Sequence, residues 1–124
     1  MKTARLALVF LFGASAAYGD DVDEIMDAAS DGIVVVSNVA GSVEVSGWSR
    51  NQVEVTGELG SRVEELIFER DGDEILIKVK VPRNNNGGIS SDLSINIQVA
   101  SSLQVNTVSA DIDVSDVEGE QELK

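Results

Sequence analysis

The 124-residue chain contains no cysteine and no histidine. Without cysteine there is no disulfide, no thiol nucleophile and no lipid-modified cysteine anchor. Without histidine the commonest general base is missing, and the two absences together remove the usual zinc ligands. The sequence therefore argues against an enzyme, and it predicts no cofactor and no catalytic residue.

Aromatic and basic residues are also scarce. Aromatics make up 4% of the chain, and beyond residue 19 only Trp48 and Phe68 remain, so we expect a core of aliphatic and β-branched side chains. Nine Lys and Arg stand against 22 Asp and Glu, which gives a formal net charge of −13. A field of this sign repels nucleic acid and anionic lipid and attracts cations or basic partners. We therefore expect a soluble acidic protein with no nucleic-acid partner.

Residues 1–19 have the features of a secretory signal peptide. Lys2 and Arg5 form a basic start, which is followed by the apolar run LALVFLFGASAA and the small-x-small pattern AYG. The run is shorter than the roughly 20 residues that a bilayer span needs. We expect cleavage before Asp20, no stable membrane span, and export to the periplasm or the extracellular medium. The mature chain would carry 9 − 2 = 7 basic and 22 acidic residues, a net charge of −15.

The rest of the chain divides at Ile33. Residues 20–32 are acidic and lack period-two alternation, so we expect a solvated acidic leader with one helical turn around Ile25 and Met26. From Ile33 onward apolar and polar residues alternate, as in the two VEV segments, which is typical of strands with one buried face. No segment after residue 32 has helical periodicity. The sequence therefore predicts an all-β domain over residues 33–124.

Residues 64–81 predict a β-hairpin. The dipeptide Asp71-Gly72 separates two apolar runs and is typical of a two-residue hairpin turn. Pro82 ends the second run because proline cannot donate a ladder hydrogen bond. A turn at 71–72 pairs apolar residues on one face and also sets two glutamates opposite each other. The expected pairs are Phe68 with Ile75, Leu66 with Ile77, and Glu69 with Glu74.

One pattern occurs twice, at a constant offset of 69 residues and without a gap. The segment VSNVAGSVEV aligns with VNTVSADIDV, so Val36, Val39, Val43 and Val45 align with Val105, Val108, Ile112 and Val114. Short strands joined by small-residue corners favour a β-solenoid-like fold of the right-handed β-helix type, or a curled β-sandwich. The alternative is that two strand-turn-strand units share a pattern common to β-proteins. A true repeat predicts that Val36, Val43, Val45, Val105, Ile112 and Val114 line one core.

The residues with chemical potential are few. Asp111, Asp113 and Asp116 have the spacing of calcium ligands, although the glycine and distal glutamate of an EF-hand loop are missing. Asp111 and Asp113 could also form a glycosidase-type carboxylate pair, but sugar clefts usually contain more aromatic residues than this chain has. A solvated acidic face is the simpler interpretation. Trp48 is either an exposed interaction anchor or a corner plug that packs on the valine core.

Three stretches in this order resemble the putative adhesin family, whose members are secreted bacterial β-strand-repeat domains of unknown function related to the head domain of auto-transporter adhesins. They are NVAGSVEVSGWSRNQVEVTGELG, the hairpin LIFERDGDEILIKVKVP, and LSINIQVASSLQVNTVSADIDVSDVEGE. The resemblance covers residues 33–124. One departure is Ala100, where such proteins often carry proline.

The resemblance implies a β-solenoid-like fold and a non-catalytic, adhesin-like binding or structural module of the bacterial cell envelope. The alternative is a periplasmic regulatory or scaffold protein of an envelope-stress system. Either role implies an unknown protein or cell-surface ligand as partner. Family members usually continue through further coils after the position of residues 117–119, so we expect a C-terminal truncation. An uncovered last coil also predicts self-association through the C-terminal edge.

Overall fold

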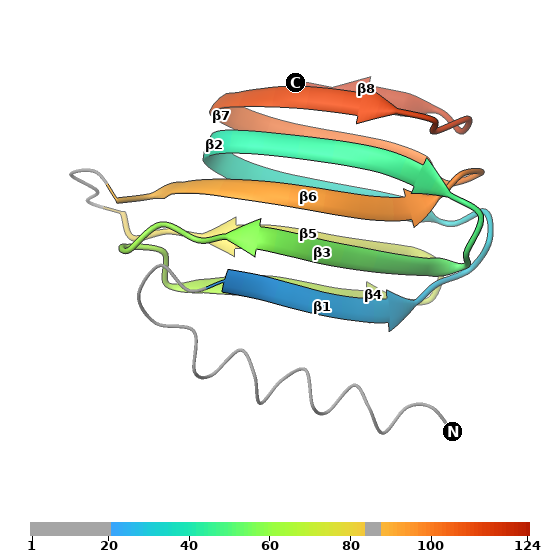
Figure 1. The fold of residues 1–124 in the computed structure, drawn as a ribbon, viewed down its shortest axis with the longest axis horizontal. Coiled ribbons are helices and arrows are strands. Elements are labelled where there is room, and N and C mark those ends of the chain that lie inside the picture. Colours follow the sequence, from blue (N-terminus) through green and yellow to red (C-terminus); the bar gives the residue numbers. More distant parts are fainter. Residues whose placement is uncertain (1–20, 84–87) are drawn as a thin grey trace.

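A computed structural model describes residues 21–83 and 88–124, so the expected signal peptide and part of the polar loop 83–91 lie outside the described residues. The described residues form strands and no helix, which confirms the all-β prediction; consequently none of them belongs to a helix able to cross a membrane. The strands make one sheet that curls into a half-barrel (Figure 1). They are β1 (Asp21–Asp27), β2 (Ile33–Trp48), β3 (Gln52–Glu58), β4 (Glu65–Asp71), β5 (Glu74–Lys80), β6 (Ser90–Gln98), β7 (Ser102–Ser115) and β8 (Gln121–Leu123).

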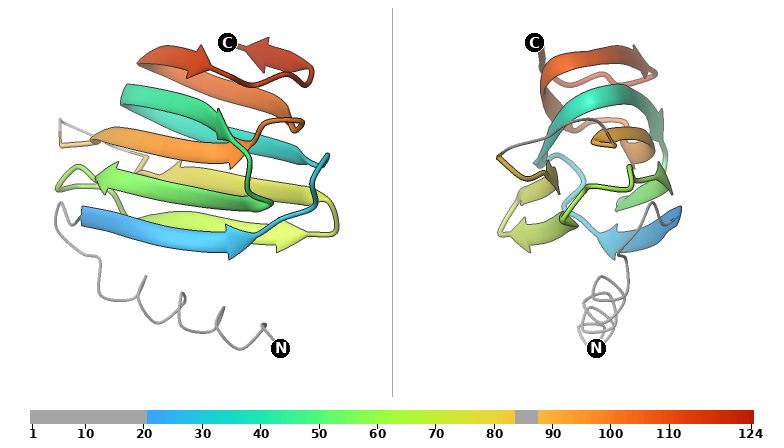
Figure 2. Two further views of the ribbon diagram at one scale, coloured as in Figure 1. Left: turned by 45° about the vertical axis from the view of Figure 1, so that its right-hand side comes forward. Right: turned by 90° about the vertical axis from the view of Figure 1, so that its left-hand side faces the viewer.

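Strand β2 bends midway and so belongs to two walls of the half-barrel (Figure 2). Its first part, Ile33–Ser37, pairs in parallel with β5, which continues antiparallel into β4. Its second part, Ala40–Trp48, pairs in parallel with β6, which continues antiparallel into β3 and then β1. We refer to the side of β4 and β5 as the hairpin wall and to the side of β1, β3 and β6 as the acidic wall.

The duplicated pattern corresponds to two strands that lie side by side. Strand β7 pairs in parallel with β2 from Ile33↔Ser102 to Ser46↔Ser115, and every pair in the register is separated by 69 residues. The prediction of a stacked repeat is therefore confirmed. One aligned pair behaves differently, because Val39 and Val108 lie at the bend, outside the paired positions, and Val108 is 80% exposed.

Glycine and asparagine shape the bend of β2. Gly41 has φ 108°, and a Cβ atom built there would lie 2.2 Å from the carbonyl oxygen of Ser91. Asn38 is buried, and its Nδ2 donates a hydrogen bond of 2.9 Å to the same oxygen. The corner thus needs a residue without a side chain at position 41 and a polar side chain that satisfies backbone at position 38.

The inward-facing residues of both walls form a single hydrophobic core. It is aliphatic apart from Phe68, as the composition predicts. Four of the six residues predicted to line it, Val36, Val43, Val45 and Val105, are at most 1% exposed. The other two, Ile112 and Val114, are only partly buried, because their segment of β7 lies at the edge of the sheet.

The expected acidic leader is a strand instead. Strand β1 pairs antiparallel with β3 over seven residues and buries Val22 and Met26 in the core, so the prediction of a solvated leader with a helical turn is wrong. The alternation is disguised because Glu24 occupies an inward position and Ile25 an outward one. Since strand patterns are recognised by apolar residues on one face, this exchange conceals the strand.

The hairpin exists, but its register differs from the prediction by two residues. The two-residue turn is Gly72-Asp73, with Gly72 at φ 63°, so a glycine occupies the first central position, as a type II′ turn prefers. A shift of two residues keeps every side chain on its face, which is why the apolar pattern could not distinguish the two registers. The observed pairs are Phe68↔Ile77, Leu66↔Val79, Glu69↔Leu76 and Asp71↔Glu74.

Candidate interaction surfaces

The three aspartates considered as calcium ligands lie near the edge of the sheet. Asp111 and Asp113 are exposed on the outward side of β7, and Asp116 follows that strand with φ 58°. Across residues 21–83 and 88–124, no group of three or more acidic side chains is placed to hold a metal ion. The three aspartates therefore do not converge on one point.

Trp48 lies half-buried at the end of β2. Its indole Nε1 donates a hydrogen bond of 2.7 Å to the carbonyl oxygen of Gln52, and the guanidinium carbon of Arg50 lies 5.0 Å from the ring centroid. The hydrogen bond and the cation–π contact both tie the ring to the turn between β2 and β3. This geometry favours the corner plug over the exposed anchor.

The outward side of the acidic wall gathers carboxylates from five strands. The strand registers place them in two adjacent rows, in which neighbouring strands lie about 4.8 Å apart. The first row is Asp21, Glu58, Asp92, Ser42 and Asp111, and the second is Asp23, Thr56, Ser94, Glu44 and Asp113. The seven carboxylates in these rows are all exposed, and we call them the acidic face.

Two features let this face carry its charge. Hydroxyl groups separate some of the acids: Ser42 Oγ donates a hydrogen bond of 2.9 Å to Asp92 Oδ1, and Ser94 Oγ one of 3.5 Å to Glu44 Oε1. Moreover, β1, β3, β6, β7 and the second part of β2 contain no lysine or arginine. The acidic face is thus uniformly negative, and it is suited to a cationic partner. Sequence reasoning noted the alternating acids of single strands but could not bring five strands together.

Glu24 is the carboxylate that the sequence misplaced. It lies opposite Val55 in the β1–β3 pair and faces inward between Val22 and Met26. Burial raises its pKa from 4.5 to about 7, since a half-desolvated carboxylate favours its neutral form. The charged form is therefore disfavoured in the folded protein at neutral pH.

This pKa shift predicts that stability falls as the pH rises. Folded Glu24 keeps its proton to about pH 7, whereas the unfolded side chain loses it near 4.5, so the stabilisation is fully present below 4.5 and disappears as the pH passes 7. After allowance for solvent screening of a half-exposed group, we expect a loss of about 1–2 kcal/mol between pH 5 and 8. Urea unfolding at both pH values measures it. The chain has no histidine to add its own titration, and Glu24→Gln should remove the dependence; an equal slope in the variant would contradict the assignment.

The edge of the sheet beyond β7 is only partly covered. Strand β8 pairs in parallel with Leu103–Val105, and the contact continues where Thr107 N donates a hydrogen bond of 3.0 Å to Lys124 O. In the part of the chain that the structure describes, Ser109–Ser115 has β2 on one side and no strand on the other. This segment is an open strand edge with half of its backbone polar groups directed away from the sheet.

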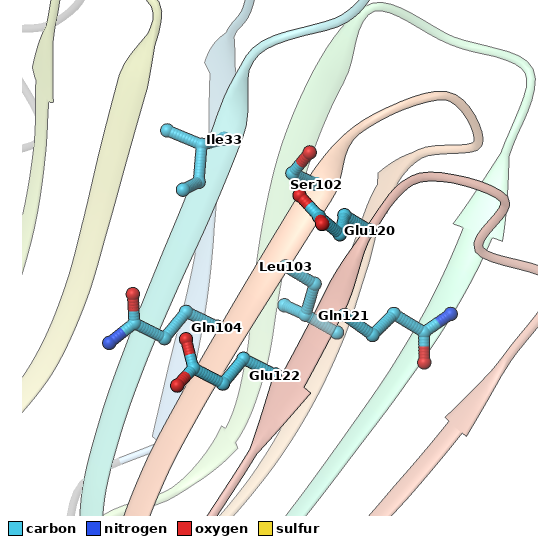
Figure 3. Close-up of a pocket in the computed structure, with 7 residues that line it drawn as sticks. All are labelled: Ile33, Ser102, Leu103, Gln104, Glu120, Gln121 and Glu122. Atoms are coloured by element: carbon cyan, nitrogen blue, oxygen red, sulfur yellow. The ribbon is translucent and has the colours of Figure 1, made fainter.

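A hollow of about 300 Å³ lies on the hairpin-wall side, where β2, β7 and β8 run next to one another (Figure 3). Ile33 contributes an apolar side chain, while Gln104 and Glu122 form one cross-strand pair of the β7–β8 register. These groups can bind a polar ligand through amide and carboxylate hydrogen bonds. The lining residues are Ile33, Ser102, Leu103, Gln104, Glu120, Gln121 and Glu122.

Comparison with known proteins gives one structural likeness for this geometry. No family model matches the chain, and no curated protein matches it. A crystal structure described as a "putative cell adhesion protein" from Clostridium sporogenes is similar with a TM-score of 0.56 and 11% sequence identity. The match covers 84% of this chain and 57% of that one, so the chain spans little more than half of its neighbour's length. At this identity the likeness shows that the two proteins share a fold.

Proposed function

We propose that this protein is an exported, adhesin-like binding or structural module of the bacterial cell envelope that acts without catalysis. The acidic face carries the proposal, because an exposed surface of seven carboxylates without an interspersed cation is costly unless a partner uses it. The lack of histidine and cysteine supports a non-catalytic role. The fold shared with a protein described as adhesive supports the adhesin-like class.

The geometry of the acidic face favours a partner with many positive charges. Its rows run across the strands about 4.8 Å apart, and outward residues repeat along each strand about every 7 Å. Each contact between exposed charges contributes about 0.2–1 kcal/mol, so useful affinity needs several contacts at once. Such binding weakens as the salt concentration rises, because the pairs lie at the surface.

The proposal also has an architectural part. The parallel stacking of β7 on β2, with β8 beginning another layer on Leu103–Val105, supports a β-solenoid type of construction in which each coil covers the one before. In such a construction the outward faces of successive coils merge into one broad surface. An adhesin-like module needs a surface of this kind.

The proposed function predicts saturable, salt-sensitive binding to cell envelopes isolated from the source bacterium. A variant that neutralises the middle of the acidic face, Glu44→Gln with Glu58→Gln and Asp92→Asn, should bind at least tenfold more weakly. A matched control neutralises three exposed acids around the hairpin turn: Glu69→Gln, Asp71→Asn and Glu74→Gln. Because the net charge changes equally, only the position of the charges differs.

Biolayer interferometry on immobilised envelopes measures both variants. The control should bind within about twofold of the wild type. Equal losses in the two variants would mean that total charge, rather than the acidic face, determines binding. Absence of saturable binding by the wild type would contradict the envelope-binding role itself.

A further inference from the structure

The open edge of β7 has the features of a strand-docking site. Ser109–Ser115 keeps an extended conformation and pairs with β2, yet no described strand lies on its other side. Every second residue of such an edge directs its N–H and C=O groups into solvent, where an added strand can bond to them.

Strand β8 shows how this edge accepts a strand. It lies parallel to β7, with Leu103 opposite Gln121 and Val105 opposite Leu123. Backbone hydrogen bonds of 2.8–3.0 Å hold it, from Leu103 N to Glu120 O, from Lys124 N to Val105 O and from Thr107 N to Lys124 O. The same edge continues into Ser109–Ser115, so a second strand can extend this ladder in the same direction.

The side chains of the edge specify what the added strand must carry. Ile112 and Val114 face inward and are only partly buried, so the strand must place apolar residues beside them. Asp111 and Asp113 face outward at the end of the two rows of the acidic face, where a strand is best matched by lysine or arginine. The complementary segment alternates basic and apolar residues.

The same charges disfavour a second copy of this chain. The outer edge of β1 would bring Asp21 and Asp23 beside Asp111 and Asp113, because these residues belong to the same two rows. Pairing of β7 with β7 of another copy would also set aspartate against aspartate. Like charges directly opposite each other on a sheet are destabilising. The self-association expected from the sequence is therefore electrostatically unfavourable here.

We infer that Ser109–Ser115 of β7 docks an extended segment of a basic partner protein, which adds to the sheet as a parallel strand. This inference rests on the proposed function and names the class of partner and the manner of its binding. The partner contributes alternating lysine or arginine and aliphatic residues. Its aliphatic side chains cover Ile112 and Val114, and its cations pair with Asp111 and Asp113.

The experiment uses a nine-residue peptide of alternating lysine and valine, with amide hydrogen exchange followed by NMR. With the peptide bound, exchange of the solvent-directed amides of Ser109–Ser115 should slow at least tenfold. A peptide of the same composition with its lysines and valines in separate blocks should not protect them. A peptide in which glutamate replaces lysine should not bind.

Two matched variants separate the edge from the acidic face. Asp111→Asn with Asp113→Asn should weaken binding of the alternating peptide at least fivefold at low salt. Asp21→Asn with Asp23→Asn removes the same charge from the same two rows at the far strand, β1, and should change binding less than twofold. All four residues are exposed, so neither variant should alter the fold.

Three outcomes would overturn the inference. Binding without protection of Ser109–Ser115 would place the cationic ligand on the acidic face and reject strand addition, while the proposed function stands. Protection of these amides without peptide, in a sample that sedimentation shows to be dimeric, would make a second copy the occupant. Absence of peptide binding while the envelope assay succeeds would reject a basic strand as the partner but leave the proposed function intact.

Discussion

Replacement of Val45 by aspartate is expected to unfold the domain. Val45 lies in the middle of β2, is fully buried, and has Ile95 of β6 and Val114 of β7 as its neighbours in the sheet. An ionised carboxylate without a partner in this core costs several kcal/mol, a large share of the roughly 5–15 kcal/mol that stabilises a typical domain. Circular dichroism at neutral pH should show loss of the β spectrum.

The adjacent residue supplies the control. Glu44 points to the opposite side of the same strand and is exposed, so Glu44→Gln should change the free energy of unfolding by less than about 0.5 kcal/mol. Urea titration of the two variants tests the alternation directly. Similar losses at positions 44 and 45 would show that the facing of β2 is wrong.

Substitution of Gly41 by alanine is expected to have the second largest effect. The backbone at this position has φ 108°, which costs a residue with a side chain about 1–3 kcal/mol. The new Cβ atom would also lie 2.2 Å from the carbonyl oxygen of Ser91, so the strands β2 and β6 would have to separate. We expect a total loss of about 3 kcal/mol or more, measured as a lower urea midpoint.

Gly72→Ala separates the two causes of this loss. Gly72 also has a positive φ, of 63°, but no atom lies within 4 Å of the position its Cβ would occupy. This variant should lose only about 1 kcal/mol, the cost of the backbone conformation alone. If both variants lost the same stability, the collision with Ser91 would not determine the corner of β2.

The two substitutions rest on features that differ in how visible they are in the sequence. The burial of Val45 follows from alternation within a few residues, and the offset of 69 correctly predicts that Val45 lies beside Val114. The need for glycine at position 41 depends on Ser91, which lies 50 residues away. Such a contact is visible only after β6 has been placed beside β2.

The errors of sequence reasoning have a common physical origin. In β1, the exchange of Glu24 and Ile25 between the two faces hides a strand that pairing with β3 nevertheless stabilises. In the hairpin, registers that differ by two residues bury the same side chains, so the turn geometry at Gly72 decides between them. Val108 follows the repeat pattern but lies at a bend, where alternation no longer determines burial.

By itself the sequence determined the all-β class, the aliphatic core and the stacking of one segment of the repeat on the other. These properties depend on composition and on a period-two pattern, both of which are local or repeat at one constant spacing. The tertiary structure alone decided that β1 joins the sheet, that carboxylates of five strands form one acidic face, and that Ser109–Ser115 lies at an open edge. These properties depend on which strands become neighbours, and that choice is made by the burial of the whole core rather than by any single segment.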